Sequence, residues 1–201
     1  MKKVVWIASL LALATYGPAQ AAGDAAAGKV KSAVCAACHG VDGNSGANPL
    51  WPKLAEQHPS YIMKQLRDFK EKKRNDETMS PMAMPLSDQD IEDLAAYFSS
   101  QKGTVGEAAA DMVEMGEAIY RAGTANGVAA CAGCHGPAGN GNGPAKFPRI
   151  SGQTAAYVAK QLKDFRAGTR SNDLNGMMRD VASRMSDKEI ESVSQYIQGL
   201  H

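Results

Sequence analysis

Apolar side chains recur at the spacing of an α-helix in several segments of the chain. In residues 60–73 the apolar positions fall on one face of a helix, and lysine and arginine side chains fall on the other. The apolar set comprises Tyr61, Ile62, Leu66 and Phe69. The same pattern returns in the second half of the chain, so amphipathic helices are predicted over Ser60–Lys73 and Ala155–Ala167. The basic run Lys70–Arg74 is most simply a solvated face.

Two further helices are predicted in each half. The last one starts at a capping box, in which a serine stands three positions before an acidic residue: Ser87 with Asp90, and Ser186 with Glu189. The predicted bounds are Ala25–Ala37 and Val113–Gly123 for the first helix, and 87–100 and 186–199 for the last. No stretch shows the strict alternation of apolar and polar residues that predicts a β-strand. The sequence therefore predicts an all-α fold.

The two halves of the chain match residue by residue, which is the signature of an internal repeat. The matching stretches are Pro52-Lys53-Leu54 with Pro148-Arg149-Ile150, Tyr61 to Phe69 with Tyr157 to Phe165, and Ser87-Asp88 with Ser186-Asp187. The second copy gains an insertion, Thr124–Ala129, and a longer segment after Phe165. We therefore expect two copies of one small domain, an N-terminal domain over residues 22–103 and a C-terminal domain over residues 104–201.

Residues 1–21 carry the features of a secretory signal peptide. Two lysines follow the initiator methionine, an apolar run spans Val4–Tyr16, and Ala19-Gln20-Ala21 forms a small-residue cleavage site. The apolar run is too short for a membrane span, which needs about 18 residues. We expect the mature protein to begin at Ala22 and, in a bacterium, to lie in the periplasm; an uncleaved anchor is the alternative.

The charge of the chain does not indicate a charged partner. Its 22 basic and 21 acidic side chains leave a formal net charge of +1. Nucleic-acid binding would need a basic patch, and none stands out, so no nucleic-acid partner is expected.

All four cysteines of the chain lie in a motif that occurs twice, Cys-x-x-Cys-His. Its members are Cys35, Cys38 and His39 in the first copy, and Cys131, Cys134 and His135 in the second. This is the attachment motif of a c-type haem. Thiols at this spacing lie on one side of a helical turn and can each add to a haem vinyl group, while the histidine reaches the iron as an axial ligand. The sequence predicts two covalently attached c-type haems.

Two other chemistries also use paired cysteines. A zinc site would need both motifs to converge on one ion, although a whole domain separates them. A redox-active dithiol would be expected in a βαβ context, which the pattern does not provide. The complete and duplicated motif favours haem over both alternatives.

A second protein ligand for each iron is expected to be a methionine, because a thioether is soft and favours reduced iron. The chain has 10 methionines, so abundance alone selects none of them. The repeat selects Met79 and Met178, the pair that stands at equivalent positions before the last helix of each copy. Met82 and Met177 are the rivals, and the adjacency of Met177 and Met178 leaves the register of the second site open.

Neither of the remaining histidines is repeated, so His58 and His201 are expected at the surface. Pro52 and Pro148, in contrast, stand at the same spacing after their haem histidines. A ligating histidine commonly donates its second ring proton to a carbonyl, which fixes its tautomer. Spacing alone leaves open whether these prolines supply that carbonyl or only shape a turn.

With these features in place, the chain resembles the cytochromes c4, the di-haem, periplasmic members of the class I cytochromes c. The resemblance rests on the tandem haem motifs, on the segment Leu86–Phe98 and on the ending Ser194–His201, and it covers essentially all of the mature chain. It implies two class I domains related by a pseudo-twofold axis, with haem propionates near the interface. It also implies His/Met ligation of both irons through the methionines matched above, and it strengthens the assignment of the two proline carbonyls.

The resemblance also implies a function. Members of this family carry electrons from the respiratory chain toward terminal oxidases, so we expect an electron carrier whose partners are a respiratory-chain donor and a terminal oxidase. A di-haem peroxidase or a gas sensor would need an iron with an open position, and the symmetric methionines argue against both. No catalytic residue is expected. We expect a monomer, and loose association with a membrane is left open.

The implied interface would need hydrogen-bond donors, because an unpaired buried carboxylate is costly. Lys53 with Tyr61, and Arg149 with Tyr157, stand near the haem loops of their copies and are expected to provide these donors. The alternative is that Lys53 and Arg149 simply face solvent.

The predicted leader has a direct test. N-terminal sequencing of the protein purified from its native host should give a chain that starts at Ala22, because the cleavage site lies just before that residue. A chain that still begins at Met1 would contradict a cleaved signal peptide.

Overall fold

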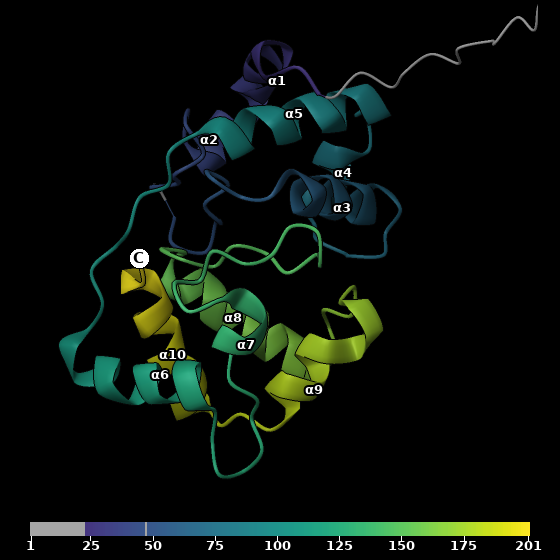
Figure 1. Cartoon of the computed structure of the whole chain (residues 1–201). Coiled ribbons are helices and arrows are strands. Elements are labelled where there is room, and N and C mark those ends of the chain that lie inside the picture. Colours follow the sequence, from purple (N-terminus) through teal and green to yellow (C-terminus); the bar gives the residue numbers. More distant parts are fainter. Residues whose placement is uncertain (1–22, 47) are drawn as a thin grey trace, which may run out of the picture.

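The computed structural model of the chain describes residues 23–46 and 48–201 (Figure 1). The predicted signal peptide lies outside the described residues. The first half contains α1 (Ala25–Lys31), the 3₁₀ turn η1 (Ser32–Val34), α2 (Ala36–His39), α3 (Pro59–Lys70), α4 (Met79–Ala83) and α5 (Asp88–Ser100). The second half contains α6 (Ala110–Ala122), α7 (Ala132–His135), α8 (Ala155–Ala167), the 3₁₀ turn η2 (Leu174–Gly176), α9 (Met177–Ser183) and α10 (Asp187–Gly199). The described part of the chain has no β-strand, only an isolated bridge between Asn142 and Phe147, so the all-α prediction is confirmed.

Both predicted capping boxes are present. At the start of α5, Ser87 Oγ accepts a hydrogen bond from the backbone N–H of Asp90 (3.1 Å), and the Asp90 carboxylate accepts one from the backbone N–H of Ser87 (2.8 Å). Ser186 and Glu189 exchange the same two bonds at the start of α10, at 3.3 and 2.7 Å. These bonds satisfy backbone donors that have no partner within the helix, and the last helices begin where they were predicted.

The other helices differ from prediction at their ends. The predicted helix Ala25–Ala37 is interrupted, because α1 ends at Lys31 and the chain tightens into η1 before the haem motif. The first helix of the second half begins earlier than predicted, at Ala110. The helix predicted to end at Lys73 stops at Lys70, since Lys72 takes a left-handed conformation with a φ of 57°.

The first and last helices of each half cross at a glycine. Gly28 of α1 lies against α5, where an added Cβ would come within 2.0 Å of the carbonyl oxygen of Asp93. Gly116 of α6 lies against α10 in the same way, with 2.3 Å to the carbonyl oxygen of Ser192. Only glycine, which has no Cβ, allows the two backbones to approach so closely. The crossing closes each half around a core of its own.

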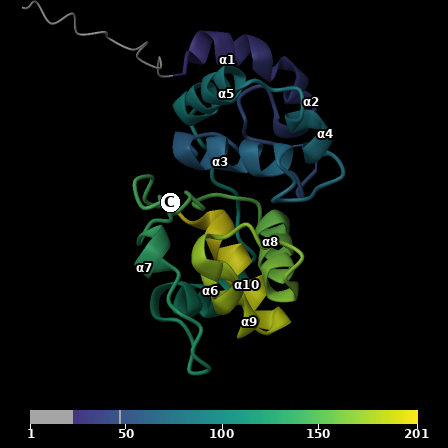
Figure 2. The same ribbon diagram turned by 90° about the vertical axis from the view of Figure 1, so that its right-hand side faces the viewer.

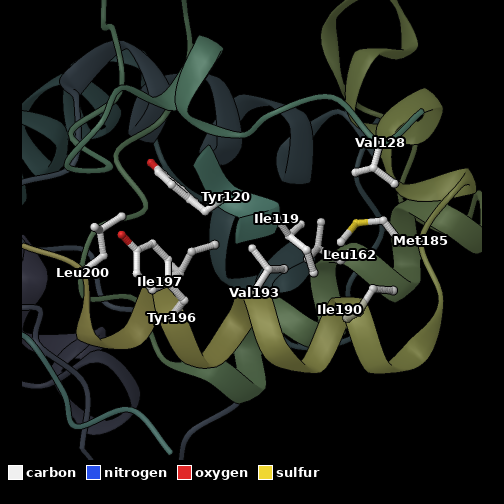
Figure 3. Close-up of a cluster of buried hydrophobic side chains, with 10 residues drawn as sticks. All are labelled: Ile119, Tyr120, Val128, Leu162, Met185, Ile190, Val193, Tyr196, Ile197 and Leu200. Atoms are coloured by element: carbon white, nitrogen blue, oxygen red, sulfur yellow. The ribbon is translucent and has the colours of Figure 1, made fainter. Parts of the chain in front are cut away.

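The two hydrophobic cores are separate. The core of the first half comprises Ile62, Leu94, Ala95, Tyr97 and Phe98. The larger core of the second half comprises Ile119, Tyr120, Val128, Leu162, Met185, Ile190, Val193, Tyr196, Ile197 and Leu200 (Figure 3). Figures 1 and 2 show the halves as two stacked helical lobes, with α1 to α5 in one lobe and α6 to α10 in the other. This arrangement confirms the prediction of two copies of one small fold.

The two halves meet through reciprocal hydrogen bonds. Gln57 Nε2 donates to the carbonyl oxygen of Arg149 (2.8 Å), and Gln57 Oε1 accepts from the backbone N–H of Arg149 (3.0 Å). Gln153, at the matching position of the second half, exchanges the same pair of bonds with the backbone of Lys53, at 3.0 and 2.9 Å. Each contact has a mirror contact between the equivalent residues, as a twofold interface requires. The halves are therefore related by a pseudo-twofold axis.

A pair of arginines crosses the same interface. Arg74 Nη2 donates to the hydroxyl of Tyr157 (3.2 Å), and Arg170 Nη2 donates to the hydroxyl of Tyr61 (2.9 Å). Each guanidinium also lies over a phenylalanine ring of its own half, 4.6 and 4.4 Å from the ring centroid. The prediction that Lys70–Arg74 is a solvated face is therefore wrong for Arg74. The pattern of apolar and polar residues around one helix does not show that Arg74 contacts the second half of the protein.

The basic side chains expected at the interface lie there. Lys53 Nζ donates to the carbonyl oxygen of Thr104 at 2.8 Å. Arg149 Nη2 forms an ion pair with Glu56 of the other half, at 3.0 Å, and its side chain is only 15% exposed. Neither residue simply faces solvent.

The close helix crossing makes stability sensitive to substitution of glycine. Gly28→Ala should lower the free energy of unfolding by ~1–3 kcal/mol, because the new methyl group would force α1 away from α5. Chemical denaturation of the haem-loaded protein measures this loss. Gly133→Ala is the matched control, since nothing lies within 4 Å of a Cβ at that position and Ala37 holds the equivalent place in the first half. If Gly28→Ala left the free energy of unfolding unchanged, or if Gly133→Ala lowered it by as much, the close packing of α1 on α5 would be contradicted.

Candidate haem-binding sites

Each haem motif forms a single helical turn. α2 follows Cys35 and α7 follows Cys131, and in both the backbone N–H of the motif histidine donates to the carbonyl oxygen of that cysteine at 2.9 Å. A glycine, Gly40 or Gly136, ends the turn with a φ of 78° or 79°, which glycine adopts without strain. The turn holds two cysteines and one histidine in a fixed mutual arrangement, as covalent haem attachment requires.

A proline carbonyl holds each motif histidine. Nδ1 of His39 lies 2.8 Å from the carbonyl oxygen of Pro52, and Nδ1 of His135 lies 2.9 Å from that of Pro148. A carbonyl oxygen can only accept a hydrogen bond, so Nδ1 carries the proton and Nε2 keeps its lone pair. The question that the spacing left open is answered, because both prolines supply the acceptor.

Burial favours the neutral form of the two imidazoles. His39 is 6% exposed and His135 is 7% exposed. Burial lowers the pKa of both rings below its usual value, while the hydrogen bond to the proline carbonyl opposes this shift. A neutral imidazole with an unprotonated Nε2 is the form that binds a metal. Both histidines therefore meet the chemical requirements of an axial ligand.

No disulfide joins the cysteines of the two motifs. Burial raises the pKa of Cys131 to about 11, and burial together with the nearby Cys38 raises the pKa of Cys35. Redox-active thiols have a lowered pKa, so these values disfavour a catalytic dithiol. Within residues 23–46 and 48–201, the structure shows no group of three or more His, Cys, Asp or Glu side chains that could hold a metal ion.

The methionines selected by the repeat lie on two short helices that the sequence did not predict. Met79 is the first residue of α4, and Met178 is the second residue of α9. Ala83 and Ala182, about one turn further along, are both 0% exposed. Residues four apart lie on the same face of a helix, so Met79 and Met178 lie on the buried faces of α4 and α9.

The rival methionines are more exposed. Met82 is 39% exposed and Met177 is 36% exposed, whereas Met79 and Met178 are half-buried. Met178 also packs against the hydrophobic core of the second half. Burial therefore favours the same pair as the repeat.

The two unrepeated histidines lie apart from the motifs. His201 is exposed, as expected. His58 is half-buried instead of free at the surface, because its Nε2 contacts the carbonyl oxygen of Asn140 in the other half, at 2.8 Å. The sequence reasoning also missed the interface glutamines and arginines, although their identity in both copies was a signal that could have found them.

Each half thus offers the groups that a c-type haem requires. Two cysteine sulfurs can add to the vinyl groups, an imidazole Nε2 can bind the iron, and a half-buried thioether lies on a short helix of the same half. The donor set is the same in both halves, so it fits two equivalent haem sites.

Comparison with known proteins points the same way. The family model described as cytochrome c matches residues 25–102 and 113–201. The chain is 54% identical to the cytochrome c4 of Azotobacter vinelandii over 96% of each protein. It is 53% identical to the cytochrome c4 of Pseudomonas aeruginosa over 97% of this chain and 98% of that protein. A crystal structure of reduced recombinant cytochrome c4 from Pseudomonas stutzeri matches with a TM-score of 0.86 at 53% identity, over 90% of this chain and 100% of that chain.

Covalent attachment at each motif can be counted by mass. The denatured mature protein should retain two haems, because thioether bonds survive unfolding. Replacing both Cys35 and Cys38 with alanine should leave one haem, and replacing both Cys131 and Cys134 should leave the other. Mass spectrometry measures the count. Retention of no haem, or of a single haem, in the unaltered protein would refute attachment at both motifs.

Proposed function

The chain belongs to the cytochrome c family, among the cytochromes c4, and on this premise we propose that it passes single electrons from a respiratory-chain donor toward a terminal oxidase in the periplasm. It carries two c-type haems and is an electron carrier, not an enzyme. The equivalence of the two sites carries the proposal. Each half has a buried histidine held by a proline carbonyl and a half-buried methionine at a matching position of the repeat.

We assign the site residues by role. When bound, each haem supplies the one-electron chemistry of its iron. The residues that would attach the haems through thioether bonds are Cys35, Cys38, Cys131 and Cys134. His39 with Met79 would bind one iron, and His135 with Met178 would bind the other. A thioether ligand favours reduced iron, and two protein ligands would leave neither iron open to a substrate, as suits a carrier.

Hydrogen bonds hold both proposed ligands in place. The proline carbonyls fix the tautomer and orientation of the histidine rings. Asp76 Oδ1 accepts from the backbone N–H of Met79 at 2.8 Å, and Asp173 Oδ2 accepts from the backbone N–H of Arg179 at 3.1 Å, so a carboxylate caps the first turn of α4 and of α9. Ligands anchored in this way should move little when the iron gains or loses an electron, which supports repeated transfer.

The proposed location rests on the predicted signal peptide, residues 1–21. We propose a periplasmic monomer with two domains, residues 22–103 and 104–201, in keeping with the two ranges that the family model matches.

Among the helices of residues 23–46 and 48–201, none is both long enough and apolar enough to cross a membrane.

The ligand assignment can be tested by removing each thioether. Met79→Ala should abolish the sulfur-to-iron charge-transfer band of one haem and lower its reduction potential, because the ligand that favours reduced iron is lost. Met178→Ala should do the same to the other haem. Absorption spectra and a redox titration measure both effects. Carbon monoxide should leave the spectrum of the reduced wild-type protein unchanged and should alter that of each variant.

Met82→Ala and Met177→Ala are the matched controls, since both side chains are more exposed. Neither should lose the band or bind carbon monoxide. If one of these substitutions removes the band instead, the register of that site is wrong.

The proposed route of electrons has its own test. Reduced holoprotein should be oxidised by membranes of the native host in the presence of oxygen, and an inhibitor of the terminal oxidase should stop this reaction. The absorbance of the reduced haems, followed after rapid mixing, measures the rate. Membranes that consume oxygen with other donors but leave this protein reduced would contradict the route and would leave the haem ligation untouched.

A further inference from the structure

One asparagine fills a polar site on one side of the interface between the two halves. Asn172 Nδ2 donates to Asp68 Oδ2 (2.6 Å) and to Gln65 Oε1 (3.1 Å), both on α3. Asn172 Oδ1 accepts from Arg170 Nε at 3.1 Å. The main-chain carbonyl oxygen of Asn172 accepts from Lys64 Nζ at 2.7 Å. The site therefore binds both the side-chain amide and the main-chain carbonyl of one residue.

The pseudo-twofold axis repeats this site on the opposite side of the interface. The equivalents of Lys64, Gln65 and Asp68 are three residues of α8, and the equivalent of Arg170 is Arg74. All four equivalents line an open pocket of about 140 Å³: Lys160, Gln161, Asp164 and Arg74. A single water needs only about 10–15 Å³, so the pocket has room for a polar group of several atoms.

No residue of the described chain occupies this pocket as Asn172 occupies the first site. Asn75 and Asp76 of the first half line the pocket, but neither forms with Lys160, Gln161 or Asp164 a hydrogen bond like those that Asn172 makes in the first site. Asp76, which borders the pocket, uses one carboxylate oxygen to accept from the backbone N–H groups of Thr78 and Met79, at 3.0 and 2.8 Å. The start of α4 therefore holds this segment in place.

The polar groups of the open pocket make fewer hydrogen bonds than the equivalent groups around Asn172. Asp164 Oδ2 accepts from Lys160 Nζ at 2.5 Å, and within residues 23–46 and 48–201 it has no second side-chain donor comparable to Asn172. In the same part of the chain, Lys160 Nζ has no carbonyl partner and Arg74 Nε has no acceptor. Gln161 Oε1 accepts from two arginines, whereas Gln65 Oε1 accepts from both arginines and from the asparagine.

We propose that this pocket binds an asparagine residue of a partner polypeptide. Its amide NH₂ donates to Asp164 and Gln161, its Oδ1 accepts from Arg74 Nε, and its main-chain carbonyl oxygen accepts from Lys160 Nζ. A partner held there contacts both halves of the protein at once. An aspartate in place of the asparagine is rejected, because its carboxylate has no proton to donate and would face the carboxylate of Asp164.

The probe for this site is a blocked asparagine, N-acetylasparagine methylamide, titrated into the full-length holoprotein and followed by NMR. We expect saturable shifts of the Gln161 side-chain amide and of the backbone near Asp164, at a stoichiometry of one. The blocked aspartate should bind at least tenfold more weakly. Acetamide, which lacks the main-chain carbonyl, should also bind more weakly. Absence of saturable shifts, equal binding of the aspartate, or equal binding of acetamide would each overturn the proposal.

Two substitutions separate this pocket from its filled counterpart. Asp164→Asn should weaken binding of the blocked asparagine at least tenfold, and the matched substitution Asp68→Asn should leave it unchanged. Asn172→Ala should open the filled site and raise the stoichiometry from one to two. If Asp68→Asn weakened binding of the blocked asparagine as much as Asp164→Asn, the binding would not depend on this pocket and the proposal would be overturned. An unchanged stoichiometry in Asn172→Ala would show that the two sites are not equivalent.

Discussion

A hydrogen bond from a buried imidazole to a proline carbonyl is the contact on which each haem site depends. It places the ring proton on Nδ1 and leaves Nε2 for the iron, so tautomer and orientation are set by the fold. The intervening loop is built to bring the proline back to the histidine. Gly43 and Gly139, with φ of 75° and 70°, turn the chain, and their carbonyl oxygens accept from the backbone N–H groups of Leu54 and Ile150, at 2.6 and 2.8 Å.

The pairing of the two domains also depends on a contact that occurs once in each copy of the repeat. The two copies meet across a pseudo-twofold axis, so their interface contacts come in pairs. Gln57 binds the backbone of the second domain, and the equivalent Gln153 binds the backbone of the first. The symmetry is not complete, and Asn172 marks one departure from it. The longer segment of the second half carries Asn172 into the interface, while the shorter segment of the first half ends in the cap of α4 and leaves a polar pocket. The segments that follow Arg74 and Arg170 differ in length and in sequence, and the two sides of the interface differ accordingly.

The sequence predicted those features that depend on local spacing. The haem motifs and the capping boxes at Ser87 and Ser186 are short-range patterns, and the repeat appears when the two halves of the sequence are compared. The structure agrees with all three. The two short helices α4 and α9 were missed, because they are too brief to show an amphipathic period. Arg74 was misassigned for a different reason, since its side chain contacts the second domain, which the pattern of one helix does not show. The repeat and the burial of the side chains both favour Met79 and Met178 as iron ligands, and this assignment remains a prediction.

The most direct test of the account is the protonation state of the two haem histidines. NMR of the reduced, ¹⁵N-labelled holoprotein observes the ring protons, and the exposed His201 serves as an internal reference. We expect a slowly exchanging Nδ1–H on both His39 and His135, with no proton on Nε2, because each Nδ1 donates to a proline carbonyl and each Nε2 is proposed to bind iron. A proton on Nε2, or ring protons that exchange as fast as those of His201, would contradict it.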